Sequence, residues 1–138
     1  MLPDEDKRAL SNLRYEHAEE CLRSAEALLM TGDVKGAANR AYYAVFHAMR
    51  AVLALDGIDR KHHSAIIAEF RSRYVKTGTF DKTWSNLIQI LSDYRNASDY
   101  NDFFIISRDE VSAQIDETKG FLHAVRSFLD DQADNQEH

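Results

Sequence analysis

The scarcity of residues that interrupt helices is the feature that most constrains this chain. It has one proline, at position 3, and five glycines that are scattered singly among 138 residues. A sandwich or barrel that needs many tight turns is therefore disfavoured, and a mostly helical protein is favoured. Apolar residues make up 44% of the chain, which is enough for a continuous core. At this length we expect a single domain.

Apolar residues at three- and four-residue spacing predict a long first helix and a second, central helix. The first begins near Asp4 and ends at residues 31–32. The second is capped by Asp33 and closes at residues 56–57, and its very broad apolar face marks it as central. The apolar stripe of the first helix consists of Leu10, Leu13, Ala18, Cys21, Leu22, Ala25, Leu28 and Leu29.

Three further helices are predicted in the second half of the chain. A short one covers residues 63–75, with Arg71 and Arg73 facing away from the core. The next is capped by Asp81 and runs into or ends near residues 95–98, because Asn and Ser weaken a helix there, and we expect a boundary close to Asp99. The last starts at the capping box of residues 107–110 and carries apolar residues at helical spacing up to Leu129.

These elements predict an all-α protein, an up-and-down antiparallel bundle of four to five helices over residues 1–130. Residues 131–138 are acidic and lack apolar anchors, so we expect a frayed, flexible tail. Residues 99–106 have no helical period but hold four large apolar residues in a row, at 103–106. We expect a loop there that is pinned by burial.

Composition also excludes several classes of protein. No stretch approaches the length of continuous apolar sequence that spans a bilayer, and the start of the chain is acidic where a secretory signal would be basic. The single cysteine, Cys21, cannot form an intrachain disulfide and reads as a buried, reduced thiol. We therefore expect a cytoplasmic protein that is neither secreted nor inserted in a membrane.

The charge is unevenly distributed although the net charge is −6. Residues 60–76 contain five basic residues and one acidic residue, whereas residues 99–138 contain ten acidic residues and three basic ones. The bundle should therefore have a basic side, which is either a solvated helix face or an anion-binding surface.

Several kinds of chemistry have no support. Singly placed glycines exclude a glycine-rich phosphate loop. His62 and His63 are adjacent and so point about 100° apart on a helix, and they therefore cannot chelate one metal ion as two residues four positions apart would. Their ordinary role is a polar approach to the third helix. Cys21 forms no recognisable nucleophile pair with a histidine. We expect no metal and no cofactor.

Two segments stand out for their polar and aromatic residues, at 39–47 and 94–100. Arg40 and His47 lie on an otherwise apolar helix and must reach solvent or a partner, because an unpaired buried charge is costly. Asp99 or Asp93 could supply that partner.

The same segments carry a family resemblance. The runs NRAYYAVFHAMRAVLALDG, KHHSAIIAEFRSRYVKTG and RNASDYNDFF resemble the HEPN superfamily, and within it the small HEPN proteins encoded beside a minimal nucleotidyltransferase. The resemblance implies a helical bundle that forms a symmetric homodimer, with an arginine facing its twofold mate across a cleft. Many such proteins are metal-independent endoribonucleases, and some are the toxin of a toxin–antitoxin pair.

The family motif is an arginine, a polar residue and, a few positions later, a histidine. Arg95 and Asn96 match its first part, but Tyr100, Asn101 and Asp102 stand where the histidine should fall. Arg95 can supply the cation that stabilises a phosphorane. Asp99 could act as the base and Tyr100 as the acid. Their ordinary pKa values, near 4 and 10, make both of them poor proton-transfer catalysts at neutral pH.

His47 or His62 could replace the missing histidine from a neighbouring helix. The candidate residues for binding RNA or a nucleotide are Arg40, Tyr43, His47, Lys61 and His62. The structural alternative for residues 95–100 is a helix end in which Asp99 pairs with Arg95 or Arg40, while Tyr100 packs at the subunit seam.

Two functions follow from the resemblance. The first is an RNA-targeting, endoribonuclease-like toxin component that works with a nucleotidyltransferase antitoxin. The alternative is a nuclease-inactive module that binds or scaffolds a nucleotide or a nucleotidyltransferase partner. In toxin-type relatives a tyrosine two positions beyond the motif histidine accepts adenylyl groups. Asp102 has that spacing here, and Tyr100 is the nearby phenol. A homodimer is also expected from the broad apolar face of the central helix and from residues 103–106.

Overall fold

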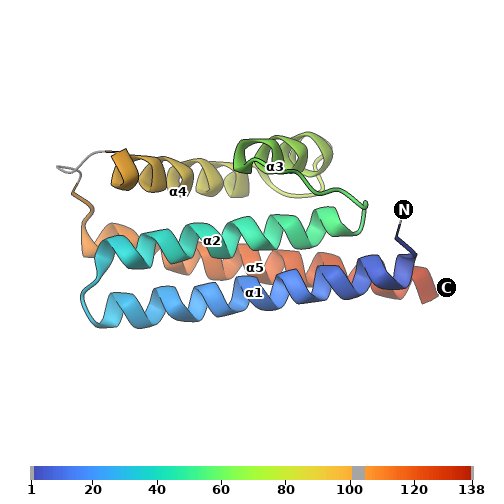
Figure 1. The fold of residues 1–138 in the computed structure, drawn as a ribbon, viewed down its shortest axis with the longest axis horizontal. Helices are drawn as coiled ribbons and strands as arrows, with labels where there is room; N and C mark the ends of the chain where they lie inside the picture. The colour runs from blue at the N-terminus through green and yellow to red at the C-terminus, as the bar shows by residue number, and fades with distance from the viewer. Residues whose placement is uncertain (1, 101–104, 138) are drawn as a thin grey trace.

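Four long helices alternate in direction along the molecule, and a short helix that follows the second of them lies beside the start of the third (Figure 1). The computed structural model describes residues 2–100 and 105–137, without the side chains of residues 99, 100, 136 and 137. The elements are α1 (Asp4–Met30), α2 (Val34–Ala54), α3 (His63–Phe70), the π-helix η1 (Arg71–Val75), α4 (Lys82–Tyr100) and α5 (Arg108–Glu137). The predicted all-α, up-and-down antiparallel bundle is confirmed.

Helix α2 is the centre of the bundle, as its broad apolar face predicts. It packs against α1, α3, α4 and α5, and most of its residues are buried. Asp33 caps it by accepting a hydrogen bond from the backbone N–H of Gly36 at 2.9 Å, and Gly57 follows it with a φ of +71°. Because the chain's own helices cover this apolar face, the face by itself does not argue for a dimer.

Helix α1 turns a partly different face to the core from the predicted stripe. Leu13 is 49% exposed, while Ser11, Arg14 and Tyr15 are buried. The hydroxyl of Ser11 donates to the carbonyl of Ala51 at 2.6 Å. The hydroxyl of Tyr15 donates to a carbonyl of α5 at 3.0 Å. These polar side chains can be buried because each finds a partner in a neighbouring helix.

Helix α4 runs through residues 95–98 to Tyr100, the last residue described before the gap, so the boundary predicted close to Asp99 stays a prediction. Residues 101–104, which include two of the four apolar residues expected to pin the following loop, lie outside the described residues. Ile106 is buried, as expected, but Ile105 is 88% exposed. Of the two apolar residues of this loop that the structure describes, only Ile106 is therefore anchored by burial.

Helix α5 begins at the predicted cap, where the backbone N–H of Glu110 donates to the Ser107 hydroxyl at 3.1 Å. It continues to Glu137, beyond Leu129, which is the last apolar residue of the predicted helical spacing. The domain limit at residue 130 and the flexibility of residues 131–138 stay predictions. None of the helices in the described ranges is long and apolar enough to cross a membrane.

Candidate functional site

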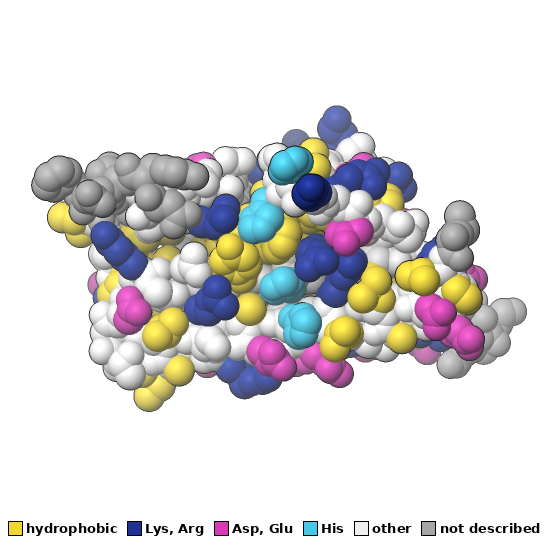
Figure 2. Space-filling model, viewed as in Figure 1, with side chains coloured by type: hydrophobic (Ala, Val, Ile, Leu, Met, Phe, Trp, Pro, Cys, Tyr) yellow, Lys and Arg dark blue, Asp and Glu magenta, His cyan; other side chains and the backbone are white. Residues whose placement is uncertain are grey.

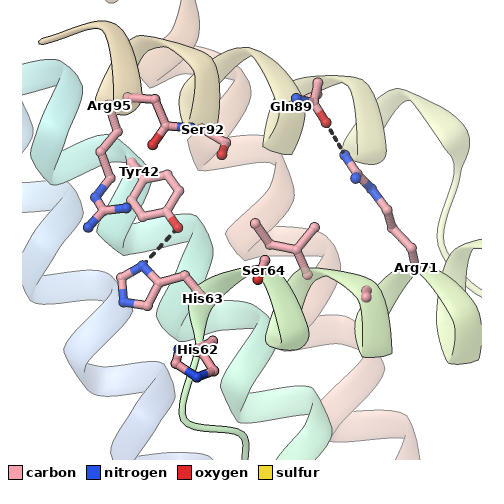
Figure 3. Close-up of a pocket in the computed structure, with 11 residues that line it drawn as sticks. Tyr42, His62, His63, Ser64, Arg71, Gln89, Ser92 and Arg95 are labelled. Carbon is pink, nitrogen blue, oxygen red and sulfur yellow. Dashed lines mark hydrogen bonds between the residues drawn. The ribbon is translucent and has the colours of Figure 1, made fainter. Parts of the chain in front are cut away.

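A cleft of about 450 Å³ opens between the α3–η1 segment and α4. Residues 64, 67, 68 and 71 form one wall, and residues 89, 92, 95 and 96 form the other, so each wall is one face of a helical segment. The cleft is lined by Tyr42, His62, His63, Ser64, Ile67, Ala68, Arg71, Gln89, Ser92, Arg95 and Asn96 (Figure 3). No Asp or Glu is among these lining residues, and two of them are arginines.

Arg95 lies over two tyrosine rings of α2. Its Cζ is 5.1 Å from the ring centre of Tyr42 and 5.7 Å from that of Tyr43. A guanidinium above an aromatic face is held by the ring quadrupole without losing its charge. No carboxylate whose side chain is described forms an ion pair with Arg95. Its positive charge is thus presented at the cleft.

His63 completes this end of the cleft. Its Nδ1 and the hydroxyl of Tyr42 are joined by a hydrogen bond of 3.0 Å (Figure 3), and its ring centre is 4.1 Å from that of Phe46. Burial, and next the positive charges of Arg95 and Arg50, lower the pKa of His63. The imidazole is therefore neutral at neutral pH and able to accept a proton. Burial raises the pKa of Tyr42, which Arg95 opposes.

His47 lies further along the same face, outside the lining of the cleft. Its ring is 6.2 Å from that of Tyr43 and 5.8 Å from that of His17 on α1. Its Nδ1 is buried and has no hydrogen-bond partner among the described residues. Burial and then the charge of Arg50 lower its pKa to about 4. Figure 2 shows a row of histidine side chains across this face, with Lys and Arg side chains beside it.

Arg40 contacts Tyr43 and Asn39 rather than Asp93. It lies 4.9 Å above the ring of Tyr43 and donates to the side chain of Asn39 at 3.1 Å. Asp93 instead accepts a hydrogen bond from Gln89 at 2.9 Å. The pairing of Arg40 with Asp93 is therefore not seen, and the side chain of the other proposed partner, Asp99, lies outside the described residues.

The structure brings some of the predicted site residues together and separates others. Arg95, Asn96 and His62 line the cleft. Tyr43 lies beneath Arg95, whereas Lys61 is exposed and outside the lining. The predicted roles of Asp99 and Tyr100 fall on side chains that the structure does not describe.

Sequence reasoning missed several residues of the cleft: Tyr42, His63, Ser64, Arg71, Gln89 and Ser92. Tyr42 fitted the apolar pattern of the central helix, and Arg71 had been expected to face away from the core toward solvent. In the sequence, these residues differ from others only by their helical spacing along each wall. That spacing indicates a cleft only once α3 is known to lie opposite α4. Within the described ranges, no group of three or more His, Cys, Asp or Glu residues is placed to hold a metal ion.

Comparison with known proteins agrees with the fold. A family model for the HEPN domain matches residues 11–128. A "UPF0332 protein" of Thermotoga maritima is 32% identical over 114 residues, which cover 83% of this chain and 86% of that protein. A protein of Methanocaldococcus jannaschii named "Putative toxin MJ0142" is 28% identical over 123 residues, covering 89% of this chain and 83% of that protein. The chain therefore belongs to the HEPN domain family.

Proposed function

We propose that this protein is the toxin-like, RNA-targeting member of a pair with a nucleotidyltransferase, and that its cleft binds and cuts single-stranded RNA without a metal. The observation that carries the proposal is the placement of His63 against Tyr42 and Arg95 in a cleft without a described carboxylate. A neutral imidazole next to an unpaired guanidinium is the pair of groups that phosphate-ester cleavage requires.

In this proposal His63 takes the place of the histidine that the motif lacks after Arg95. Its Nε2 removes the proton of a ribose 2′-hydroxyl, and the 2′-oxygen attacks the adjacent phosphorus. The bond from phosphorus to the 5′-oxygen then breaks, and that oxygen takes up a proton. The products are a 2′,3′-cyclic phosphate and a 5′-hydroxyl. Arg95 stabilises the negative charge that builds up on the phosphorane oxygens.

The hydrogen bond to Tyr42 allows both proton transfers. When Nδ1 of His63 carries the proton and donates it to the Tyr42 oxygen, Nε2 has a free lone pair and acts as the base. The imidazolium formed in that step keeps its Nδ1–H bond to the Tyr42 oxygen, and its Nε2–H is the acid that protonates the leaving 5′-oxygen and restores the neutral ring. Tyr42 is thus a positioning residue that holds the ring in both protonation states.

The partner, the dimer and the cytoplasmic location are part of the same proposal. Two relatives from Methanocaldococcus jannaschii carry the name "Putative toxin", and a toxin needs a partner that neutralises it. A homodimer interface would bury on the order of 1,200 Å² or more. Leu13 and Ile105, at 49% and 88% exposure, are exposed apolar side chains available to it. Light scattering at tens of micromolar should return twice the mass of the chain, and a monomer mass would overturn the dimer.

The proposed cleavage is tested by incubating the purified protein with a mixed RNA pool in EDTA. The variants are Arg95→Ala and His63→Asn, whose amide can keep the bond to Tyr42 while the Nε2 position is lost. Arg126→Ala is the matched control, because Arg126 also lies over a tyrosine, at 4.8 Å from the ring centre of Tyr15, but outside the lining of the cleft. The wild type and Arg126→Ala should release 2′,3′-cyclic phosphate ends. The other two variants should lose at least a hundredfold in rate.

The missing motif histidine favours a second candidate, a nuclease-inactive module that binds RNA, a nucleotide or the nucleotidyltransferase. The same experiment separates the two when binding is measured beside cleavage. RNA binding that depends on Arg95, with no cutting by any sample, would support the inactive module. Neither binding nor cutting by the wild type would overturn both RNA functions.

A further inference from the structure

The far end of the cleft contains a second arginine whose charge is not neutralised by a described residue. Arg71 donates from Nε to the hydroxyl of Ser85 at 2.9 Å, and from Nη2 to the Ser85 carbonyl at 3.3 Å and to Oε1 of Gln89 at 3.0 Å. All three acceptors are neutral. A guanidinium has five N–H donors, and the two on Nη1 have no acceptor in the part of the chain that the structure describes.

The neighbouring arginines show what a neutralised guanidinium looks like in this segment. Arg60 and Arg73 both bind the carboxylate of Glu69, at 2.8 and 3.0 Å. Arg71 lies between them in the sequence but is half-buried and turned toward α4. Within the basic segment at residues 60–76, Arg71 therefore points its charge toward the cleft, whereas Arg60 and Arg73 form exposed ion pairs with Glu69.

Arg71 is fixed in place rather than loosely attached. Its three hydrogen bonds to α4 hold the guanidinium plane, and the residue opens the π-helix η1, in which the N–H of Lys76 donates to the carbonyl of Arg71 at 2.9 Å. Short π-helical turns are frequent at functional sites. A guanidinium that is already oriented loses less conformational entropy when it binds an anion.

The two arginines lie at opposite ends of one groove (Figure 3). Between them the lining includes the hydroxyls of Ser64 on one wall and Ser92 on the other, and Ile67 adds an apolar side chain to it. Such a surface suits ribose hydroxyls and a base between two phosphates. The groove has one positive charge at each end and no described carboxylate between them. This arrangement fits an RNA strand with a phosphate at each arginine, because a single phosphate would occupy only one of the two charges.

We propose that Arg71 forms a second phosphate subsite, so that the cleft binds an extended segment of single-stranded RNA through one phosphate at Arg95 and another at Arg71. This inference rests on the proposed function, because it names how the same cleft holds its RNA. Arg71 is accordingly a positioning residue that selects for strand length and does not take part in the chemical step.

The test uses 2′-O-methyl RNA oligonucleotides of one to six nucleotides, which cannot be cut, and measures their binding by fluorescence anisotropy. Wild-type affinity should rise by about tenfold at the length that first reaches the second phosphate, as expected for a charge-assisted contact. Arg71→Gln keeps an acceptor and donor for Ser85 but removes the charge. It should abolish that rise, leave the shortest oligonucleotides unaffected, and reduce the slope of log affinity against log salt by about 0.7.

Two further variants separate charge from structure. Arg71→Lys restores the charge and should recover most of the salt dependence, whereas Arg73→Ala removes a neighbouring arginine that Glu69 neutralises and should change nothing. If Arg71→Gln and Arg73→Ala bind every length as the wild type does, the second subsite is overturned while RNA binding at Arg95 stands. If the wild type binds no oligonucleotide, the proposed function and this inference fail together.

Discussion

The hydroxyl of Tyr42 on the central helix lies 3.0 Å from Nδ1 of His63, which starts α3 after an interval of 21 residues. This bond joins the short helix to the bundle core at the edge of the cleft. It also fixes the orientation of an imidazole whose other ring nitrogen, Nε2, has no hydrogen-bond partner among the described residues. The local geometry of the candidate site therefore depends on one pair of side chains from two helices.

Replacing Tyr42 by Phe should remove the bond and keep the ring beneath Arg95. We expect the free energy of unfolding to fall by about 1 kcal/mol, since His63 loses a partly buried partner. Tyr43→Phe is the matched control, because no hydrogen bond of the Tyr43 hydroxyl is found among the described residues. Urea unfolding measures both, and ¹⁵N NMR of the His63 ring should show a changed tautomer balance in Tyr42→Phe only. Equal stability of the two variants would contradict the prediction.

The pKa of His63 should respond to Arg95. Because burial and the nearby positive charge both lower that pKa, Arg95→Gln should raise it toward the ordinary histidine value while burial still acts. A proton NMR titration of the His63 ring reports this without any activity. In the cleavage assay, the acid limb of the pH profile should move to higher pH in the same direction as the titration. No movement of the NMR titration would mean that Arg95 does not control the imidazole.

His47 should make the protein sensitive to acid. Its folded-state pKa is lowered to about 4, so between the ordinary histidine pKa of about 6.5 and pH 4 the unfolded chain binds more protons than the folded one. Stability is then complete above about pH 6.5 and falls as the pH drops through that window. After allowance for solvent at this half-buried ring, we expect a loss of roughly 1 to 2 kcal/mol.

The measurement is denaturant unfolding at pH 7.5 and pH 5. His47→Gln should reduce the difference between the two pH values, although His63 keeps part of it because its pKa is lowered as well. The exposed His123 provides the control, and His123→Gln should behave as the wild type does. An unchanged pH difference in His47→Gln would exclude His47 as the source.

The close approach of α4 to α5 should be sensitive to side-chain volume at Gly120. A Cβ added there would lie 3.0 Å from Cη2 of Trp84, so the branched side chain in Gly120→Val must displace the indole. We expect a loss of about 1 to 3 kcal/mol from overpacking. Trp84 is the only tryptophan, so its fluorescence should shift with the mutation. In a Trp84→Phe background, Gly120→Val should lower the free energy of unfolding by less. An equal loss in both backgrounds would mean that the overpacking does not involve Trp84.

Adenylyl transfer to Tyr100 is the regulatory prediction. Tyr100 is five residues after Arg95. A phosphate added to Tyr100 would carry negative charge and would compete with RNA for the Arg95 guanidinium. If the protein is neutralised as its toxin-type relatives are, mass spectrometry after co-expression with a minimal nucleotidyltransferase should find the Tyr100 peptide heavier by an adenylyl group. Tyr94 should stay unmodified, because its hydroxyl donates to Glu110 at 3.0 Å. Protection of growth with an unmodified Tyr100 would mean neutralisation by another route.

Local patterns in the sequence are enough to predict the α-helices and their order. Helical periodicity, the caps at Asp33 and Ser107, and the glycine at position 57 act over a few residues, so they can be recognised in a linear string. The same local logic failed where tertiary contacts decide. Ser11 and Arg14 of α1 are buried because other helices provide their hydrogen-bond partners.

The candidate site was only partly accessible from the sequence. Arg95 and Asn96 were found because they match a motif within adjacent positions. Tyr42, His63 and Arg71 were assigned other roles, since their significance comes from which helix face meets which across the cleft. Hydrogen bonds and electrostatic fields act over a few ångströms in space and do not depend on separation along the chain. Only the packing of α3 and α4 against α2 therefore decided which histidine and which arginines share the cleft.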